Sequence, residues 1–180
     1  MEDIIELLHQ IGKLKDLKRT GWVVRGIPNP ESVADHSFRV AVMALILADE
    51  FKLDSKKCVS MALIHDIAES IAGDITPHDG VSEKDKHDIE LNAMKTILGK
   101  TKNKEILNLW KEYEERKTEE AKFVFELDKM EMLLQAFEYE HRHKKDKINL
   151  LEFWKSVENN VKDPKMIKII EILKKKKVKF

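Results

Sequence analysis

The sequence predicts an all-α globule with two buried central helices. Apolar side chains recur at helical spacing along the 180 residues, and no segment alternates in the way that a half-buried strand does. The six glycines and four prolines, which interrupt helices, gather mainly in two short segments, 21–30 and 73–80. Since a chain of this length normally forms one domain, we expect a single domain over residues 1–180.

The first expected helix covers about residues 3–18 and has one apolar face. A loop follows, in which two prolines keep the chain extended and delay the next helix. Ser32 and Asp35 resemble a capping box, so they predict the start of a helix over about 32–51. This second helix is apolar nearly all round over residues 40–47, which is typical of a buried helix.

The next expected helix, about 55–71, is also apolar until it reaches an adjacent His-Asp pair. Segment 81–117 is the most polar part of the chain and is expected at the surface, together with His78 and His87. The helices expected after residue 80 cover about 82–98, 104–116, 118–143, 150–159 and 165–176.

Charge and cysteine content exclude several classes of function. The 33 Lys and Arg residues balance 33 Asp and Glu residues, which argues against a nucleic-acid or membrane-surface partner. Cys58 is the single cysteine, so no internal disulfide forms and a reducing compartment fits best. The acidic segment MEDIIELLHQ is unlike a signal peptide, and no apolar stretch has membrane-spanning length. We therefore expect a cytoplasmic protein.

His65 and Asp66 interrupt an otherwise apolar helix, with MALI before them and IA after them. A buried charge is costly unless it is paired or binds a metal ion. Adjacent helix residues diverge by about 100 degrees, so both side chains can reach an ion that lies beside the helix. Glu69 follows one turn later on the same face, and Asp74 comes just past the expected helix end. This segment is therefore rich in metal-binding groups.

Two more polar residues stand at buried positions of other helices. His36 lies in the first turn of the helix over 32–51, and Asp128 interrupts the apolar run FVFELDKMEMLLQAF. Two imidazoles and two carboxylates suit a divalent cation such as Mn, Co, Fe, Ni, Zn or Mg. The plain alternative is that His65 and Asp66 form a buried hydrogen-bonded pair. The wider set favours a metal site made by His36, His65, Asp66 and Asp128.

Three segments, DHSFRVAVMA, ALIHDIAE and ELDKMEMLLQA, follow the order H…HD…D. In this the sequence resembles the HD-domain metal-dependent phosphohydrolases. It is further similar to their 5'-deoxynucleotidase subfamily, which includes the bacterial YfbR-like enzymes and the HD domain-containing protein 2 branch. The segments that carry this closer resemblance are RTGWVVRGIPNPESVADHS, ALIHDIAESIAGDITP and AKFVFELDKMEMLLQAFEYE.

The resemblance implies one helical HD domain, usually a homodimer, with a metal-ligand core at about 31–140 and C-terminal helices at 145–180. The four metal ligands of the family map onto His36, His65, Asp66 and Asp128. The implied activity is a phosphomonoesterase: metal-activated water attacks a deoxynucleoside 5'-monophosphate, a small-molecule nucleotide, and releases deoxynucleoside and phosphate.

The resemblance also implies roles for residues around the ligands. Arg19 would bind the phosphate, Trp22 would pack near the sugar, and Glu69 and Asp74 would serve catalysis. In one branch Glu69, Asp74 and the backbone carbonyl of Ile75 hold a second metal ion. The bacterial pattern has Arg and Trp adjacent, whereas two residues separate them here, so Trp22 is either a sugar platform or a plain core or dimer-contact residue.

Two other functions stay open at this point. The protein could be an HD hydrolase that acts on another nucleotide or phosphate ester, or a non-catalytic, nucleotide-binding regulatory protein. The intact ligand set, together with Arg19, Glu69 and Asp74, favours the enzyme.

Overall fold

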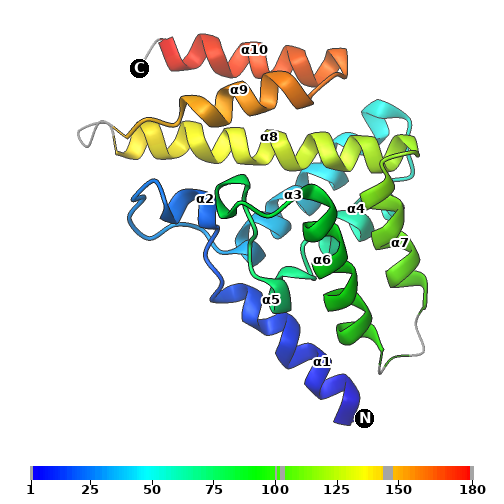
Figure 1. The fold of residues 1–180 in the computed structure, drawn as a ribbon. Helices are drawn as coiled ribbons and strands as arrows, with labels where there is room; N and C mark the ends of the chain where they lie inside the picture. The colour runs from blue at the N-terminus through cyan, green and yellow to red at the C-terminus, as the bar shows by residue number, and fades with distance from the viewer. Residues whose placement is uncertain (1, 100, 102–103, 144–147, 179–180) are drawn as a thin grey trace.

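The computed structural model describes residues 2–99, 101, 104–143 and 148–178, and in these parts of the chain it contains helices and no strand (Figure 1). The expected all-α fold is thus confirmed. In chain order the α-helices are α1 (Glu2–Gly12), α2 (Thr20–Val23), α3 (Val33–Leu47), α4 (Ser55–Ile64), α5 (Glu69–Ala72), α6 (Glu83–Leu98), α7 (Lys104–Glu115), α8 (Glu119–Arg142), α9 (Leu151–Asn160) and α10 (Pro164–Val178). Short 3₁₀ helices lie at Lys13–Lys15, Ala48–Phe51 and Pro77–Asp79.

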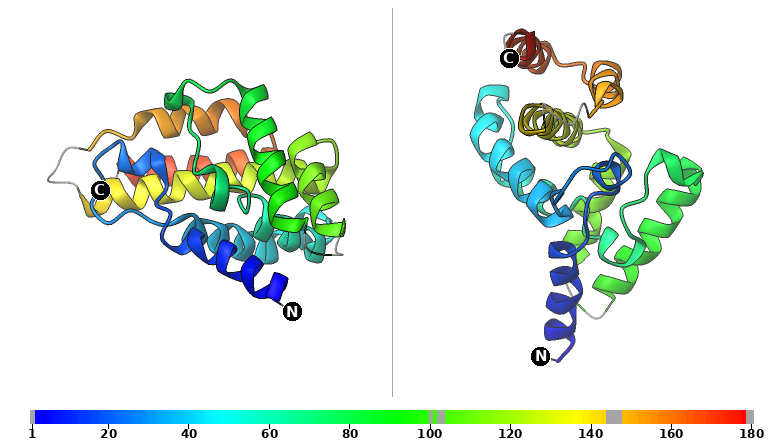
Figure 2. Two further views of the ribbon diagram at one scale, coloured as in Figure 1. Left: turned by 60° about the horizontal axis from the view of Figure 1, so that its bottom comes forward. Right: turned by 90° about the vertical axis from the view of Figure 1, so that its left-hand side faces the viewer.

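Helix α8 is the central element of the fold. It packs against α3, α4 and α7 on one side and against α9 and α10 on the other, and Figure 2 shows it end-on between these two groups. Its buried face includes Val124, Leu127, Met130 and Leu133, and each such side chain stabilises the fold by about 1.5–3 kcal/mol. Because this packing fixes α8 in place, a polar residue on its buried face also has a fixed position.

Helices α3 and α4 pack closely against each other, as expected for central helices. Their contact buries small residues such as Ala41, Ala44 and Ala62. The expectation that α3 is buried all round is wrong, however, because Phe38 is 67% exposed and Leu45 is 61% exposed. One apolar face of α3 is thus exposed at the surface.

The predicted start of α3 is confirmed in detail. The Ser32 hydroxyl oxygen accepts a hydrogen bond from the Asp35 backbone N–H at 3.1 Å, and the Asp35 carboxylate accepts one from the Ser32 backbone N–H at 2.8 Å. This reciprocal capping fixes the first turn of α3, which carries His36.

The expected helix over 55–71 is broken at His65–Ala68, which form a tight turn between α4 and α5. In an unbroken helix the carbonyl of His65 would accept the backbone N–H of Glu69. Here it accepts the indole N–H of Trp110 at 3.2 Å, and the Glu69 N–H bonds to the carbonyl of Asp66 at 3.1 Å. The break between α4 and α5 therefore coincides with a hydrogen bond from Trp110, which lies in a distant part of the chain.

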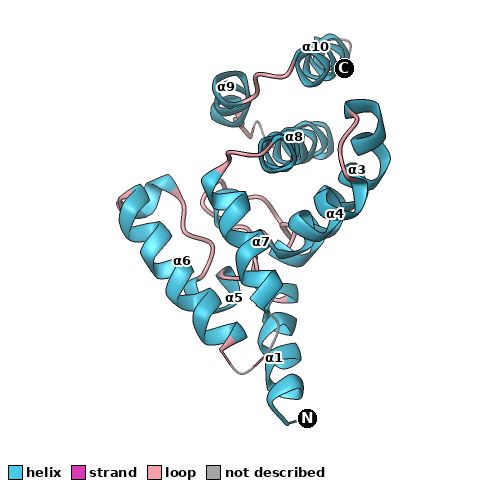
Figure 3. Ribbon diagram, turned by 90° about the vertical axis from the view of Figure 1, so that its right-hand side faces the viewer, coloured by secondary structure: helices cyan, strands magenta, loops and turns pink. Residues whose placement is uncertain are grey.

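Helices α6 and α7 lie at the outside of the fold, as their polarity suggested, but each also buries one face. Figure 3 shows α6 beside α5 and α7, and these helices are in contact. Together they bury Ala93, Met94 and Trp110. Among the described residues, no helix combines the length and the apolar character that crossing a membrane requires.

Candidate active site

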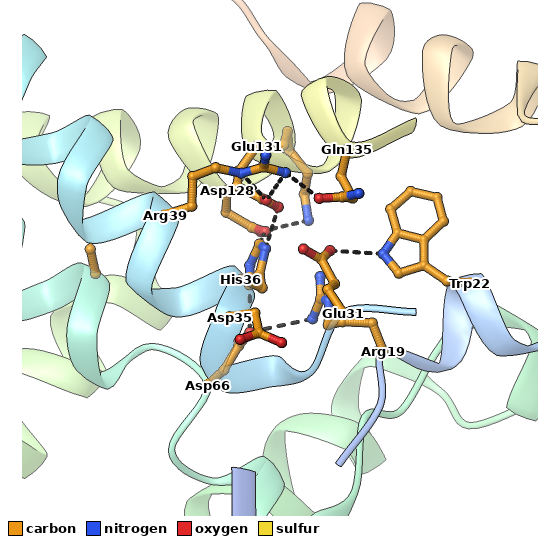
Figure 4. Close-up of polar contacts among 12 residues, drawn as sticks. Arg19, Trp22, Glu31, Asp35, His36, Arg39, Asp66, Asp128, Glu131 and Gln135 are labelled. Carbon is orange, nitrogen blue, oxygen red and sulfur yellow. Dashed lines mark hydrogen bonds and ion pairs between the residues drawn. The ribbon is translucent and has the colours of Figure 1, made fainter. Parts of the chain in front are cut away.

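Four side chains from three parts of the fold converge at the centre of the molecule. Nε2 of His36 lies 3.2 Å from Oδ1 of Asp128 and 3.7 Å from Oδ2 of Asp66. Nε2 of His65 lies 3.3 Å from the same Asp66 oxygen and 3.4 Å from Nε2 of His36. Figure 4 shows His36, Asp66 and Asp128 turned toward one another from α3, the turn after α4, and α8. The four predicted ligand residues are thus brought together.

The hydrogen bonds of the two histidines leave their Nε2 atoms facing this cluster. His65 Nδ1 donates to the carbonyl of Ala62 at 2.7 Å, which places the proton on Nδ1 in the neutral ring. His36 Nδ1 bonds to the Glu131 carboxylate. Imidazole rings that bind metals are oriented by such bonds to their other nitrogen. The donor set therefore fits a divalent cation.

The carboxylates of the cluster are held in their ionised form. Burial raises the pKa of Asp128, but Lys129 and His36 lower it by more, so the net pKa is well below its usual range. Burial and Arg19 lower the pKa of His36, while Glu131 and Asp128 raise it by more, to about 9. A cation that binds here therefore displaces a proton from His36.

Glu131 is a member of the site that sequence reasoning missed. It is fully buried, and besides His36 it accepts a hydrogen bond from Nε of Arg39 at 2.7 Å. Arg39 is in turn held by Glu138 and Gln135. Glu131 is three residues after Asp128 in the same apolar run. Glu131 is thus marked in the sequence by the same signal as Asp128, a charged residue inside an apolar run.

Arg19 lies among three of the predicted site carboxylates. Its Nη1 is 3.3 Å from Asp66, 3.6 Å from Asp74 and 3.8 Å from Glu69. Thr20 fixes Asp74, because its backbone N–H donates to Oδ2 of Asp74 at 2.6 Å. Arg19 precedes the His-Asp pair in the sequence, and Glu69 and Asp74 follow it. The structure brings all three into one cluster.

Glu69 is buried, and no hydrogen bond among the described residues reaches its Oε2 atom. Burial raises its pKa well above the ordinary value, and the negative charges of Asp66 and Asp74 raise it further. Arg19 lowers the pKa by less. The protonated form of Glu69 is thus favoured more than that of an exposed glutamate.

Trp22 is only 2% exposed, and its indole N–H donates to Oε1 of Glu31 at 2.8 Å. Its ring packs against Phe153, with 4.3 Å between the centroids, and edge-on against Tyr139 at 5.3 Å. The backbone N–H of Glu31 donates to the hydroxyl of Tyr139. Trp22 is therefore a core residue, yet part of it also lines the site cavity.

A cavity of about 450 Å³ opens onto the cluster, which is within the usual size of small-molecule sites. It is lined by Arg19, His65, Asp66, Glu69 and Asp74 at the cluster. It is also lined by one face of α6, which carries Glu83, Lys86, His87 and Glu90.

Two histidines expected at the surface belong to this cavity. His87 is half-buried and stacks on Trp110 with 5.9 Å between ring centroids, and His78, which is exposed, contacts Nη2 of Arg25 at 3.2 Å. The His87 side chain is 45% exposed, so it lies at the surface as expected while it also lines the cavity. The backbone carbonyl of Ile75 accepts a hydrogen bond from Lys86 at 3.1 Å.

Comparison with known proteins identifies the family. The model of the HD domain family matches residues 11–168. The chain belongs to the HD-domain family. A mouse (Mus musculus) protein named 5'-deoxynucleotidase HDDC2 is 42% identical over 173 residues, which cover 94% of this chain and 86% of that protein. A protein of the same name from Dictyostelium discoideum is 43% identical and covers 91% of this chain and 93% of its own length.

Solved structures share the fold of this HD domain. A conserved hypothetical protein from Pyrococcus furiosus is 37% identical with a TM-score of 0.82, and the match covers 95% of this chain and 99% of that one. A protein from Magnetospirillum magnetotacticum, described as a predicted metal-dependent phosphohydrolase, is 27% identical with a TM-score of 0.72 and covers 99% of this chain and 92% of that one. The family thus implies a divalent metal ion, for which His36, His65 and Asp66 are candidate ligands in the structure.

Proposed function

We propose that this HD-domain protein is a metal-dependent phosphomonoesterase that hydrolyses deoxynucleoside 5'-monophosphates to deoxynucleoside and phosphate. The main observation is that three of the four candidate ligands, His65, Asp66 and Asp128, line one cavity together with Arg19 and the buried acid Glu69. The fourth, His36, contacts Asp66 and Asp128. The substrate class is supported by the 5'-deoxynucleotidase relatives, which match over most of their length.

His36, His65, Asp66 and Asp128 would hold the ion, because their donor atoms lie 3.2–3.7 Å from one another in the contacts described. When bound, a divalent cation there would supply Lewis acidity to a phosphoryl oxygen and to water. The second ion expected from the resemblance would lie at Glu69, Asp74 and the carbonyl of Ile75. It would replace the proton on Glu69, so this ion and proton donation by Glu69 are alternatives. Its entry would require Lys86 to release that carbonyl.

Arg19 would bind the phosphate through its planar fork, which matches two phosphoryl oxygens. Its position is supported by the three carboxylates that surround Nη1. Burial lowers its pKa, while these carboxylates raise it by more, so the guanidinium stays charged. The charge can then offset the charge that develops on the phosphoryl oxygens.

Glu69 would donate a proton to the leaving 5' oxygen, because burial and the neighbouring Asp66 and Asp74 raise its pKa and so favour its protonated form. Asp74 would orient Arg19 and the attacking water, held in place by Thr20. We propose direct attack by water on phosphorus. Acid-quenched single turnovers should therefore contain no phosphoenzyme, and a trapped phosphoenzyme would contradict this mechanism.

Phosphate release from a panel of 5'- and 3'-monophosphates, in deoxy and ribo forms and with metals added singly, tests the proposal. We expect release from 5'-deoxy substrates, loss of metal in His65→Ala, and retained metal with a lower rate in Glu69→Ala. Fully active Glu69→Ala would refute the role of Glu69. Turnover of a different phosphate ester alone would point to another HD hydrolase, and no turnover with any metal would point to a nucleotide-binding regulatory protein.

We also propose that residues 1–180 form one domain and that two chains form a cytoplasmic homodimer. One domain is supported by α8, which contacts the N-terminal helices as well as α9 and α10. A dimer is supported by the exposed apolar residues Phe38, Leu45 and Ile46 along α3. Sedimentation of the wild type and of Phe38→Glu tests this, because a dimer through α3 would dissociate in the variant.

A further inference from the structure

The charges around the cavity raise a problem for the binding of a phosphate dianion. Eight Asp or Glu side chains line the cavity, and burial raises the pKa of two of them, Glu69 and Glu90. The other six still outnumber the four Lys or Arg side chains that line it among the described residues. Arg19 is already close to three carboxylates. A divalent ion at the four-residue cluster offsets part of this negative charge, yet the phosphate still needs further cationic partners.

Three other cationic side chains line the cavity. Two of them contact groups other than the acidic residues around Arg19. Lys129 is bound to Oδ2 of Asp128 at 2.9 Å and lies over the ring of Phe125. The guanidinium of Arg116 stacks on the same ring at 4.1 Å from its centroid. Lys86 is the remaining one, on the face of α6 that lines the cavity.

Lys86 reaches the same short loop segment as Arg19. Its Nζ donates to the carbonyl of Ile75 at 3.1 Å, and Nη1 of Arg19 lies 3.6 Å from the carboxylate of the preceding residue, Asp74. The ammonium of Lys86 and the guanidinium of Arg19 therefore contact neighbouring residues of one loop segment.

The ammonium of Lys86 also has capacity for a ligand. It carries three N–H donors, of which one is used by Ile75 and another faces Oε1 of Glu90 at 3.5 Å. The Lys86 side chain is 35% exposed, so its tip is accessible from the cavity. One donor thus stays available for a phosphoryl oxygen.

We propose that Lys86 is a second phosphate-binding residue, which contacts the 5'-phosphate of the substrate from α6 while Arg19 contacts it from beside Asp74. This inference rests on the proposed function, since the ligand is the phosphate of that substrate. The α6 helix then serves the site directly, because one polar face of it lines a binding cavity.

Calorimetric binding of inorganic phosphate and of thymidine to the metal-loaded protein tests the proposal. For Lys86→Met we expect a 10- to 100-fold weaker Kd for phosphate, as for a lost charge-assisted contact, and an unchanged Kd for thymidine. Lys86→Arg should regain part of the phosphate affinity. Lys84→Met is the matched control, because Lys84 is exposed on the same helix and does not line the cavity.

Steady-state hydrolysis of thymidine 5'-monophosphate separates this inference from the proposed function. We expect Lys86→Met to raise KM by about tenfold or more. Wild-type phosphate affinity and KM in Lys86→Met would overturn the role of Lys86 alone. Equal losses of phosphate and thymidine affinity would also overturn it, because they would mean that Lys86 only holds the loop.

Two further outcomes complete the test. If the wild type hydrolyses no monophosphate but needs Lys86 to bind phosphate, the proposed function fails and the anion site stands. If Lys86→Met does not fold, Lys86→Gln takes its place, because an amide can still donate to the carbonyl of Ile75 without carrying a charge.

Discussion

The buried carboxylate behind His36 offers a sharp test of the metal site. Glu131 is 0% exposed and connects Nδ1 of His36 with the guanidinium of Arg39. Burial raises its pKa, but His36 and Arg39 lower it by more, so it is ionised in the folded protein. The substitution Glu131→Gln keeps the shape of the side chain and removes its negative charge.

The size of the effect follows from these contacts. Loss of the partner of a metal-binding histidine typically weakens metal affinity by 10- to 100-fold, or about 1.4–2.7 kcal/mol. Arg39 keeps its bonds to Glu138 and Gln135, so the free energy of unfolding of the metal-free protein should fall by only about 1–2 kcal/mol. Metal affinity should therefore be affected more than folding.

Competition between the protein and a coloured chelator, with Mn²⁺, Co²⁺ and Zn²⁺ in turn, measures this change. Glu138→Gln is the control, because Glu138 bonds to Arg39 but is half exposed and has no hydrogen bond to a ligand residue. If folded Glu131→Gln binds these metals within twofold of the wild-type affinity, Glu131 does not orient a metal ligand and the prediction is refuted.

Three further outcomes concern stability, each measured by urea unfolding. Burial raises the pKa of Glu90 to about 7, so the folded state holds a proton that the unfolded state releases above pH 4.5. The free energy of unfolding should thus fall as pH rises toward 7, by up to about 3 kcal/mol, and Glu90→Gln should abolish this fall; an unchanged pH profile would contradict it. Trp110→Phe leaves the buried carbonyl of His65 without its donor and should cost about 1–3 kcal/mol, whereas a neutral effect would show that this bond is dispensable. Thr118→Ala removes the cap that accepts the Ala121 N–H and should cost about 1 kcal/mol, against no change if the α8 terminus is held by other contacts.

The helical fold and the positions of the central polar residues could be predicted because both are local patterns. His65, Asp66 and Asp128 were visible as polar residues inside apolar runs, and such residues must meet a partner. The structure brings them together with His36. Their role as metal ligands stays a prediction that the chelator experiment tests.

Long-range contacts could not be predicted in the same way. The break after α4 accompanies the bond from Trp110 to the carbonyl of His65, which lies 45 residues earlier in the sequence. The polarity of α6 indicated solvent, but residues such as Lys86 line a cavity instead. Amphipathic spacing gives the polar face of a helix, and it does not distinguish bulk water from a binding site.

The contact between Trp110 and His65 gives the protein a built-in optical reporter. The indole of Trp110 bonds to the backbone of His65 and lies against the ring of His87, which lines the cavity. Because indole emission depends on its hydrogen bond and on neighbouring imidazole groups, occupancy of the site should alter its intensity and wavelength. Trp154 in α9, which lies beneath Lys177, gives a second emitter away from the cavity for comparison. Ligand arrival could thus be followed in stopped-flow fluorescence without any attached dye.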